Sequence, residues 1–233
     1  MKVEIWSDIM CPFCYIGKRR FEESLAQFDN GKNIEIEWKS FLLSPDMKTD
    51  PTKSIHQFLA EHKGVSLEEA KGMNQYVTDM AASVGLKYDF DKTVPANSFN
   101  AHRFLHFTKQ YGKQNEAEEL LFKAYFTEGK NIDDAETLLG FAKELGLDAA
   151  ALTQAMGSEA FVNDVIADIQ EAQAIGVRGV PFFVFDRKYA VSGAQTPDVF
   201  LQTLERSYDE WQQAHPKLTI IEGDSCSVDG ECN

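Results

Sequence analysis

The sequence predicts an α/β fold made of a βαβ half and a ββα half, with a large all-helical domain inserted between the two halves. Two short stretches near the N-terminus alternate apolar and polar residues, as half-buried strands do. From about residue 54 to residue 175 the pattern changes to one helix after another. After Gly176, aromatic and β-branched residues return and indicate further strands.

The first half contains the predicted strand 3–6, a helix that begins at Cys11, and a second strand at 33–42. Pro12 suits the first helical position, because the N–H that proline lacks has no partner there. A strand–helix–strand order favours a right-handed crossover, so we expect the two strands to be parallel.

Six helices are predicted in the middle of the chain, at residues 55–62, 67–84, 98–111, 114–126, 135–145 and 158–175. Ser66 with Glu69 three residues later predicts a capping box. Asp134 and Ser158 are residue types that cap helices, and we expect each to begin one.

The second half contains a predicted hairpin, with strands at 181–185 and 189–193, and a final helix at 197–213. The predicted domains are therefore a discontinuous α/β domain (1–52 and 177–213) and a helical insertion domain (53–176). Residues 214–233 are small and acidic, and we expect a mobile C-terminal tail that carries a second cysteine pair.

Composition excludes several classes of function. The net charge of −14 repels nucleic acid and anionic membranes, so neither is an expected partner. No apolar run approaches the roughly 20 residues that span a bilayer. The N-terminus shows no secretory signal, and we expect a cytoplasmic protein. Since that compartment keeps thiols reduced, the four cysteines are expected to be catalytic, redox-sensing or metal-binding.

Cys11 and Cys14 are the residues that most clearly predict chemistry. A helix N-terminus stabilises a thiolate, which favours Cys11 as the attacking sulfur. Cys14, one turn later, is placed to resolve a mixed disulfide. The alternatives are inert thiols or a structural zinc site that adds Cys226 and Cys232, although the spacing of that tail pair is loose for zinc. The βαβ context favours a redox dithiol and no metal.

The stretch around this pair, SDIMCPFCYIGKRRF at residues 7–21, resembles the DsbA-like thioredoxin-fold oxidoreductases, specifically their FrnE-like branch. The similarity continues at 97–103, 176–183 and 192–195, and spans residues 3–210. The resemblance implies a thioredoxin fold interrupted by a helical domain, with Cys11 as an exposed nucleophile and Cys14 as the resolving thiol.

The resemblance also implies a second half of the site at Val180 and Pro181. Their peptide bond is expected to be cis and to lie beside the dithiol, and the Val180 backbone is expected to bind a polypeptide substrate as an added strand. One residue departs from the family pattern. Phe13 stands where many FrnE-like members have tryptophan and DsbA has histidine, so it offers Cys11 no hydrogen bond.

These features predict a thiol–disulfide oxidoreductase, a protein disulfide reductase or isomerase with Cys11–Cys14 as its redox-active centre. The expected partners are disulfide- or thiol-containing proteins. No tightly bound cofactor is expected, and glutathione or another low-molecular-weight thiol would reset the pair. Cys226 and Cys232 could form a redox relay or a passive disulfide. Two alternatives remain: a glutathione-dependent isomerase or transferase of a small aromatic substrate, and a non-catalytic adaptor.

Overall fold

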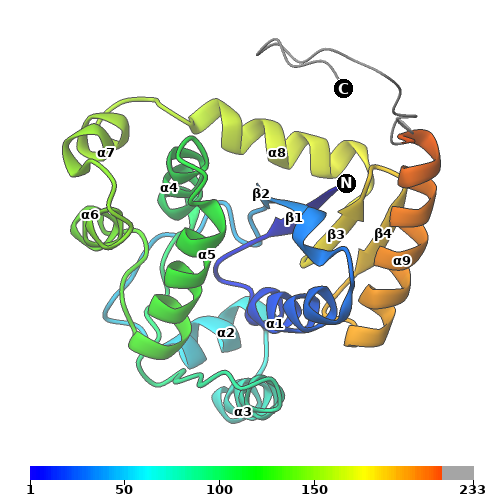
Figure 1. Ribbon diagram of the computed structural model, residues 1–233. Coiled ribbons are helices and arrows are strands. Elements are labelled where there is room, and N and C mark those ends of the chain that lie inside the picture. Colours follow the sequence, from blue (N-terminus) through cyan, green and yellow to red (C-terminus); the bar gives the residue numbers. More distant parts are fainter. Residues whose placement is uncertain (217–233) are drawn as a thin grey trace, which may run out of the picture.

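A computed structural model describes residues 1–216 and contains a four-stranded mixed sheet with helices packed on both faces (Figure 1). The strands are β1 (Lys2–Ser7), β2 (Glu35–Ser40), β3 (Phe182–Phe185) and β4 (Tyr189–Ser192). Their order is β2-β1-β3-β4. β1 and β2 are parallel, as predicted, whereas β3 is antiparallel to both β1 and β4.

The two faces of the sheet are covered by helices from different parts of the chain. α1 (Pro12–Gln27) and α9 (Pro197–Ala214) cover one face, where Phe21 and Phe200 pack against Phe183. The opposite face buries Trp6 together with Ala172 of α8 (Val162–Ala174). Because both faces are buried, β1 and β3 are dense in apolar residues.

The remaining helices lie between β2 and β3 in the sequence. They are α2 (Ile55–Lys63), α3 (Leu67–Ala82), α4 (Phe99–Lys109), α5 (Gln114–Lys123), α6 (Ala135–Glu144) and α7 (Ala149–Met156). A single 3₁₀ turn, Gly31–Asn33, precedes β2, and a π-helical turn, Ala124–Glu128, continues α5. The predicted fold class, a thioredoxin fold with a helical insertion, is confirmed.

Most predicted helix starts are confirmed. Ser66 and Glu69 form the expected capping box, and the Asp134 side chain accepts a hydrogen bond from the Thr137 N–H. Ser158 is not a cap: α8 begins at Val162, because Phe161 adopts a left-handed conformation (φ 63°) that separates it from the preceding turn. α7 was not predicted, although Asp148 caps it.

The helical segment shares its core with α1. Tyr15 of α1 stacks on Phe122 of α5 with ring centroids 4.9 Å apart, and Tyr88 stacks on Phe126 at 4.6 Å. These rings belong to one continuous cluster of buried side chains, which also contains Cys11, just before α1, and Cys14 within it. The helices therefore depend on α1 for part of their buried surface, and the division into separate domains stays a prediction.

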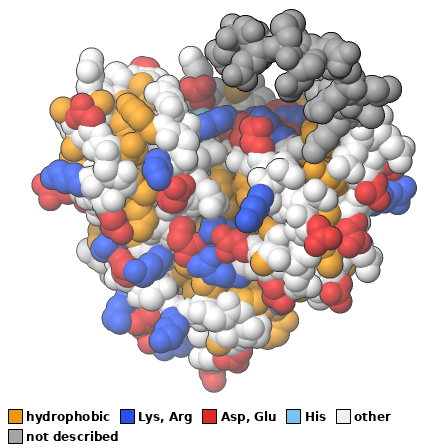
Figure 2. Space-filling model, in the orientation of Figure 1, with side chains coloured by type: hydrophobic (Ala, Val, Ile, Leu, Met, Phe, Trp, Pro, Cys, Tyr) orange, Lys and Arg blue, Asp and Glu red, His pale blue; other side chains and the backbone are white. Residues whose placement is uncertain are grey.

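Charged side chains of both signs are interspersed over the visible face, with small groups of hydrophobic side chains between them (Figure 2). Within residues 1–216, no helix combines the length and the apolar content that crossing a bilayer requires. The predictions about the C-terminal tail and about Cys226 and Cys232 lie outside the described residues.

Candidate active site

The dithiol is placed by a tight turn between β1 and α1. Cys11 is the residue just before the helix, and Pro12 occupies the first helical position, as predicted. The Cys11 N–H donates to the Asp8 carbonyl oxygen (2.9 Å). The Asp8 carboxylate accepts from the backbone N–H groups of Met10 (3.2 Å) and Leu43 (2.7 Å), so Asp8 fixes the turn against the loop after β2.

Both sulfurs are present as free thiols, but their surroundings differ. Cys14 is fully buried, and this burial raises the pKa of its thiol well above the ordinary value. The neighbouring Cys11 side chain adds to the rise, while the Asp8 backbone and the Ser7 side chain oppose it. Cys14 is therefore held as a neutral thiol while Cys11 lines the cavity described below.

The loop before β3 brings its residues to the dithiol across 169 positions of sequence. The Cys11 thiol donates to the Val180 carbonyl oxygen at 3.4 Å. The Val180–Pro181 peptide bond is cis, as the resemblance implied. Gly17 allows α1 to approach this loop, because a Cβ atom there would lie 3.0 Å from Pro181 Cγ.

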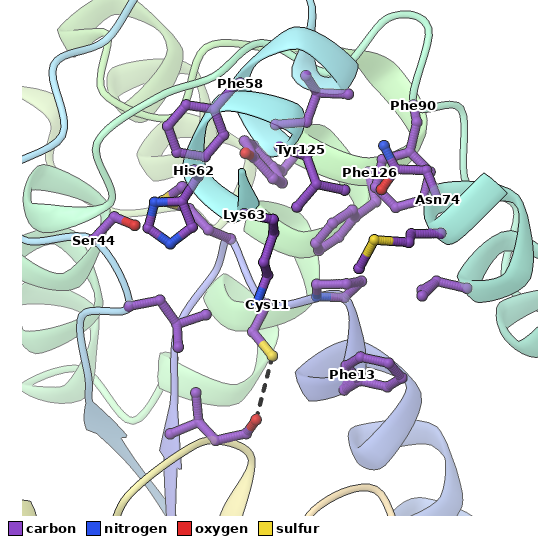
Figure 3. A pocket seen from close by; sticks show the side chains of 18 of the residues that line it. Cys11, Phe13, Ser44, Phe58, His62, Lys63, Asn74, Phe90, Tyr125 and Phe126 are labelled. Atoms are coloured by element: carbon purple, nitrogen blue, oxygen red, sulfur yellow. Dashed lines mark hydrogen bonds between the residues drawn. The ribbon is translucent and has the colours of Figure 1, made fainter. Parts of the chain in front are cut away.

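A cavity of about 380 Å³ opens over Cys11 (Figure 3). One wall comes from α2 and α3, with Phe58, Lys63 and Asn74 among its residues. Tyr125 and Phe126 of the π-helical turn form another wall. The remaining lining residues are Met10, Cys11, Pro12, Phe13, Leu43, Ser44, Ile55, Leu59, His62, Met73, Val77, Phe90, Gly179 and Val180.

The expectation of an exposed Cys11 is wrong. Only 3% of its surface is exposed, because the N-terminus of α1 packs into the core that the helical segment shares. The small exposed part of Cys11 faces this cavity. Phe13 lines this cavity and also the neighbouring shallow depression beside Tyr76 on α3.

Buried polar groups that were not predicted from the sequence lie behind the dithiol. The Ser7 hydroxyl donates to Glu118 Oε1 at 2.9 Å, and burial raises the pKa of Glu118 to about 8. His102 is also buried, with Nε2 3.7 Å from Asp8 Oδ1. The sequence does contain one indication that Glu118 is buried. It lies on the same helix face as Leu121, and an acidic residue on an apolar face is unusual.

Within residues 1–216, no group of three or more His, Cys, Asp or Glu side chains lies close enough together to bind a metal ion. The zinc alternative involves Cys226 and Cys232, which lie outside this range.

Known proteins resemble the chain over most of its length. A family model for the DSBA-like thioredoxin domain matches residues 2–205. The crystal structure of a probable DsbA oxidoreductase, SCO1869 from Streptomyces coelicolor, is 35% identical with a TM-score of 0.84, and the match covers 100% of this chain and 98% of that one. The uncharacterized protein YwbO of Bacillus subtilis (strain 168) is 29% identical over 206 residues, which cover 85% of this chain and 92% of YwbO.

A more distant structure shares the fold. The cytosolic disulfide reductase DsbM from Pseudomonas aeruginosa is 16% identical with a TM-score of 0.64, and the match covers 90% of this chain and 100% of DsbM. DsbM has also been solved with GSH.

Proposed function

Because the chain belongs to the DSBA-like thioredoxin domain family, we propose that it is a thiol–disulfide oxidoreductase acting on proteins, as a disulfide reductase or isomerase. The observation that carries the proposal is the paired environment of the two sulfurs. Cys11 precedes the first turn of α1 and lines an open cavity, whereas Cys14 is a buried thiol beside it. The unpaired N–H groups and dipole of α1 favour a thiolate at Cys11.

The proposed cycle begins with the Cys11 thiolate attacking a substrate disulfide. One substrate sulfur bonds to Cys11 and the other leaves as a thiolate. Cys14 then loses its proton and attacks the Cys11 sulfur, which expels the second substrate thiolate and leaves a Cys11–Cys14 disulfide. Two glutathione molecules return two electrons to this disulfide and become oxidised glutathione. In the isomerase direction, a second substrate thiol releases Cys11 before Cys14 attacks.

Polypeptide binding in this proposal uses the loop at Val180. Its carbonyl oxygen lies 3.4 Å from Cys11 Sγ, so a chain bound along Val180 would bring its own sulfur to the nucleophile. Backbone hydrogen bonds of that kind supply affinity without sequence preference. The structure of DsbM with GSH supports glutathione as the reducing partner. Because DsbM is a cytosolic disulfide reductase, it supports a cytoplasmic location for this protein as well.

Insulin reduction tests the proposal. Wild-type protein with glutathione should accelerate the precipitation of reduced insulin chains, and Cys11→Ser should abolish the acceleration, because serine cannot form the mixed disulfide. Retention of the wild-type rate in Cys11→Ser would contradict the proposal. Partner binding that persists in a variant without Cys11 and Cys14 would instead favour the adaptor alternative.

We also propose that Cys226 and Cys232 act as a redox relay for the dithiol. Tyr208 of α9 packs on Phe28, just past the far end of α1, which is about 24 Å long. α9 ends at Ala214, and the twelve residues from there to Cys226 can span about 40 Å when extended. That length is sufficient to reach back to Cys11.

The relay has a direct test in the oxidised protein. Partial reduction followed by peptide mass spectrometry should detect disulfides that join Cys11 or Cys14 to Cys226 or Cys232. The double variant Cys226→Ser/Cys232→Ser should reduce insulin more slowly than wild type. Equal rates together with no cross-linked peptides would contradict the relay and leave the role of Cys11 untouched.

A further inference from the structure

The cavity over Cys11 lacks the carboxylates that give the whole chain its negative charge. The protein contains 37 Asp and Glu residues against 23 Lys and Arg, yet no Asp or Glu of the described residues lines this cavity. Its ionisable lining residues, apart from Cys11 and Tyr125, are Lys63 and His62, both from the last turn of α2. A cavity without carboxylates in an acidic protein favours an anionic ligand.

The walls of the cavity are apolar and aromatic. Phe58, Phe90 and Phe126 contribute rings, and Ile55 and Val77 add aliphatic surface. A volume of about 380 Å³ lies within the range of small-molecule sites. Since only 3% of Cys11 is exposed, a compact disulfide can reach its sulfur more readily than a disulfide fixed on the surface of a folded protein.

Lys63 is placed to select the charge of such a molecule. In Figure 3 its side chain extends along the cavity toward Cys11. Within residues 1–216, no carboxylate forms an ion pair with it, whereas Lys53, just before α2, pairs with Glu61. Lys63 is exposed at the rim of the cavity, so its ammonium group attracts a carboxylate through solvent, and salt weakens this attraction.

We propose that the cavity binds small disulfides that combine an aromatic body with a carboxylate, and that Lys63 binds the carboxylate while the sulfur meets Cys11. This substrate class is additional to proteins, and it rests on the proposed redox function of Cys11 and Cys14. The Cys11 thiolate attacks the aromatic disulfide and releases one aromatic thiolate. The Cys14 thiol then loses its proton, displaces the second aromatic thiolate and leaves the Cys11–Cys14 disulfide, so two electrons pass from the protein to the ligand.

Single-turnover kinetics of the reduced full chain, carrying Cys226→Ser and Cys232→Ser, test the proposal. The anionic aromatic probe is 5,5′-dithiobis(2-nitrobenzoate), the neutral aromatic probe is 4,4′-dithiodipyridine, and the anionic aliphatic probe is 3,3′-dithiodipropionate. Each rate is divided by the rate of the same probe with free glutathione, which removes differences in intrinsic reactivity. The normalised rate should be highest for the anionic aromatic probe.

Lys63→Gln should lower the rate with the anionic aromatic probe about two- to fivefold, as loss of one solvent-exposed charge pair predicts. The same variant should leave the rate with the neutral aromatic probe unchanged, because that probe carries no carboxylate. Lys71→Gln is the matched control. Lys71 lies on α3 outside the cavity, and its substitution removes the same charge as Lys63→Gln does. It should react with both aromatic probes at the wild-type rate.

Three results would overturn the proposal while the redox function stands: an equal loss with both aromatic probes in Lys63→Gln, the same loss in Lys71→Gln, or no preference for the anionic aromatic probe. Failure of Cys11 to react with any probe or with insulin would instead contradict the proposed function itself. The two failures are therefore distinguishable.

Discussion

At the scale of single residues, two identical thiol groups acquire different properties from their positions. Cys11 lines a cavity and hydrogen-bonds to the Val180 carbonyl oxygen, while Cys14 is buried on the inner side of the turn. Burial raises the pKa of the Cys14 thiol, so in the proposed cycle Cys14 stays protonated until Cys11 has reacted. In the cycle that we propose, the charge of a Cys11 thiolate would add to that rise, and forming the mixed disulfide removes this charge, which favours the resolving step.

Glu118 provides a prediction about stability and pH. Burial raises its pKa from 4.5 to about 8 in the folded protein. Between these values the folded state binds more protons than the unfolded state, so the free energy of unfolding falls as pH rises, by at most about 1.4 kcal/mol per pH unit. Urea unfolding from pH 5 to pH 8 should show this loss in wild type relative to Glu118→Gln, which cannot ionise.

Glu116→Gln is the control for this measurement. Glu116 lies on the same helix, but its hydrogen bond with Lys113 lowers its pKa, so its stabilising charge is lost only as pH falls below its ordinary pKa of 4.5. The difference between wild type and this variant should stay constant from pH 5.5 to pH 8. A similarly constant difference for Glu118→Gln would contradict a buried, neutral Glu118.

The sequence identified single residues unevenly. The spacing of Cys11 and Cys14 was sufficient to predict the dithiol, because few other arrangements place two thiols one turn apart at a helix start. The bond between Ser7 and Glu118 could not be predicted, since it joins residues 111 positions apart. Helical periodicity shows which face of α5 is buried but not what that face contacts.

At the scale of elements, the contact between α1 and the loop before β3 fixes the site. The Gly193 N–H donates to the Pro181 carbonyl oxygen (2.8 Å), and Gly17 lies against the Pro181 ring. Gly17→Ala adds a methyl group that would lie 3.0 Å from Pro181 Cγ. We therefore expect lower stability in urea unfolding and slower insulin reduction, even though alanine favours helices over glycine by about 1 kcal/mol.

Gly140→Ala separates this contact from helix propensity. Gly140 is inside α6, and a Cβ atom there meets nothing within 4 Å. The substitution should raise the free energy of unfolding by about 0.5–1 kcal/mol and leave activity unchanged. An equal gain in both variants would show that Pro181 yields to the added methyl group, contrary to a close and rigid contact with α1.

The strands and most helices could be predicted because their patterns are local. α7 was missed because its eight residues are nearly uniform in polarity, and the start of α8 was misplaced because a left-handed Phe161 has no sequence signal. The cavity could not be predicted at all. Its walls come from α2, α3 and the π-helical turn, and only tertiary packing brings them to Cys11.

At the scale of the whole molecule, buried charges connect the helical segment to the sheet. The Asp168 carboxylate of α8 accepts from the Ser40 N–H (2.9 Å), from Lys39 (2.9 Å) and from His106 (3.1 Å). Burial alone would raise the pKa of Asp168, but these three bonds outweigh it and lower the pKa. The Trp6 indole N–H also donates to the Asp168 carbonyl oxygen. These contacts join α8 and α4 to β1 and β2.

In the cycle that we propose, three distant parts of the chain meet at one site. They are Cys11 at the start of α1, Val180 before β3, and the cavity residues of α2 and α3. This arrangement makes the identity of the attacking sulfur the central claim about the whole molecule.

Trapping of the mixed disulfide tests that claim most directly. The protein is reduced Cys14→Ser that also carries Cys226→Ser and Cys232→Ser, so that no other cysteine can displace the adduct. It is mixed with a peptide disulfide, quenched with acid, digested and analysed by mass spectrometry. The predicted result is a stable adduct of the peptide on Cys11, with no adduct at either position in the double variant Cys11→Ser/Cys14→Ser treated in the same way. An adduct on Cys14 in the converse variant Cys11→Ser, with none on Cys11 in Cys14→Ser, would contradict the assignment of Cys11 as the nucleophile.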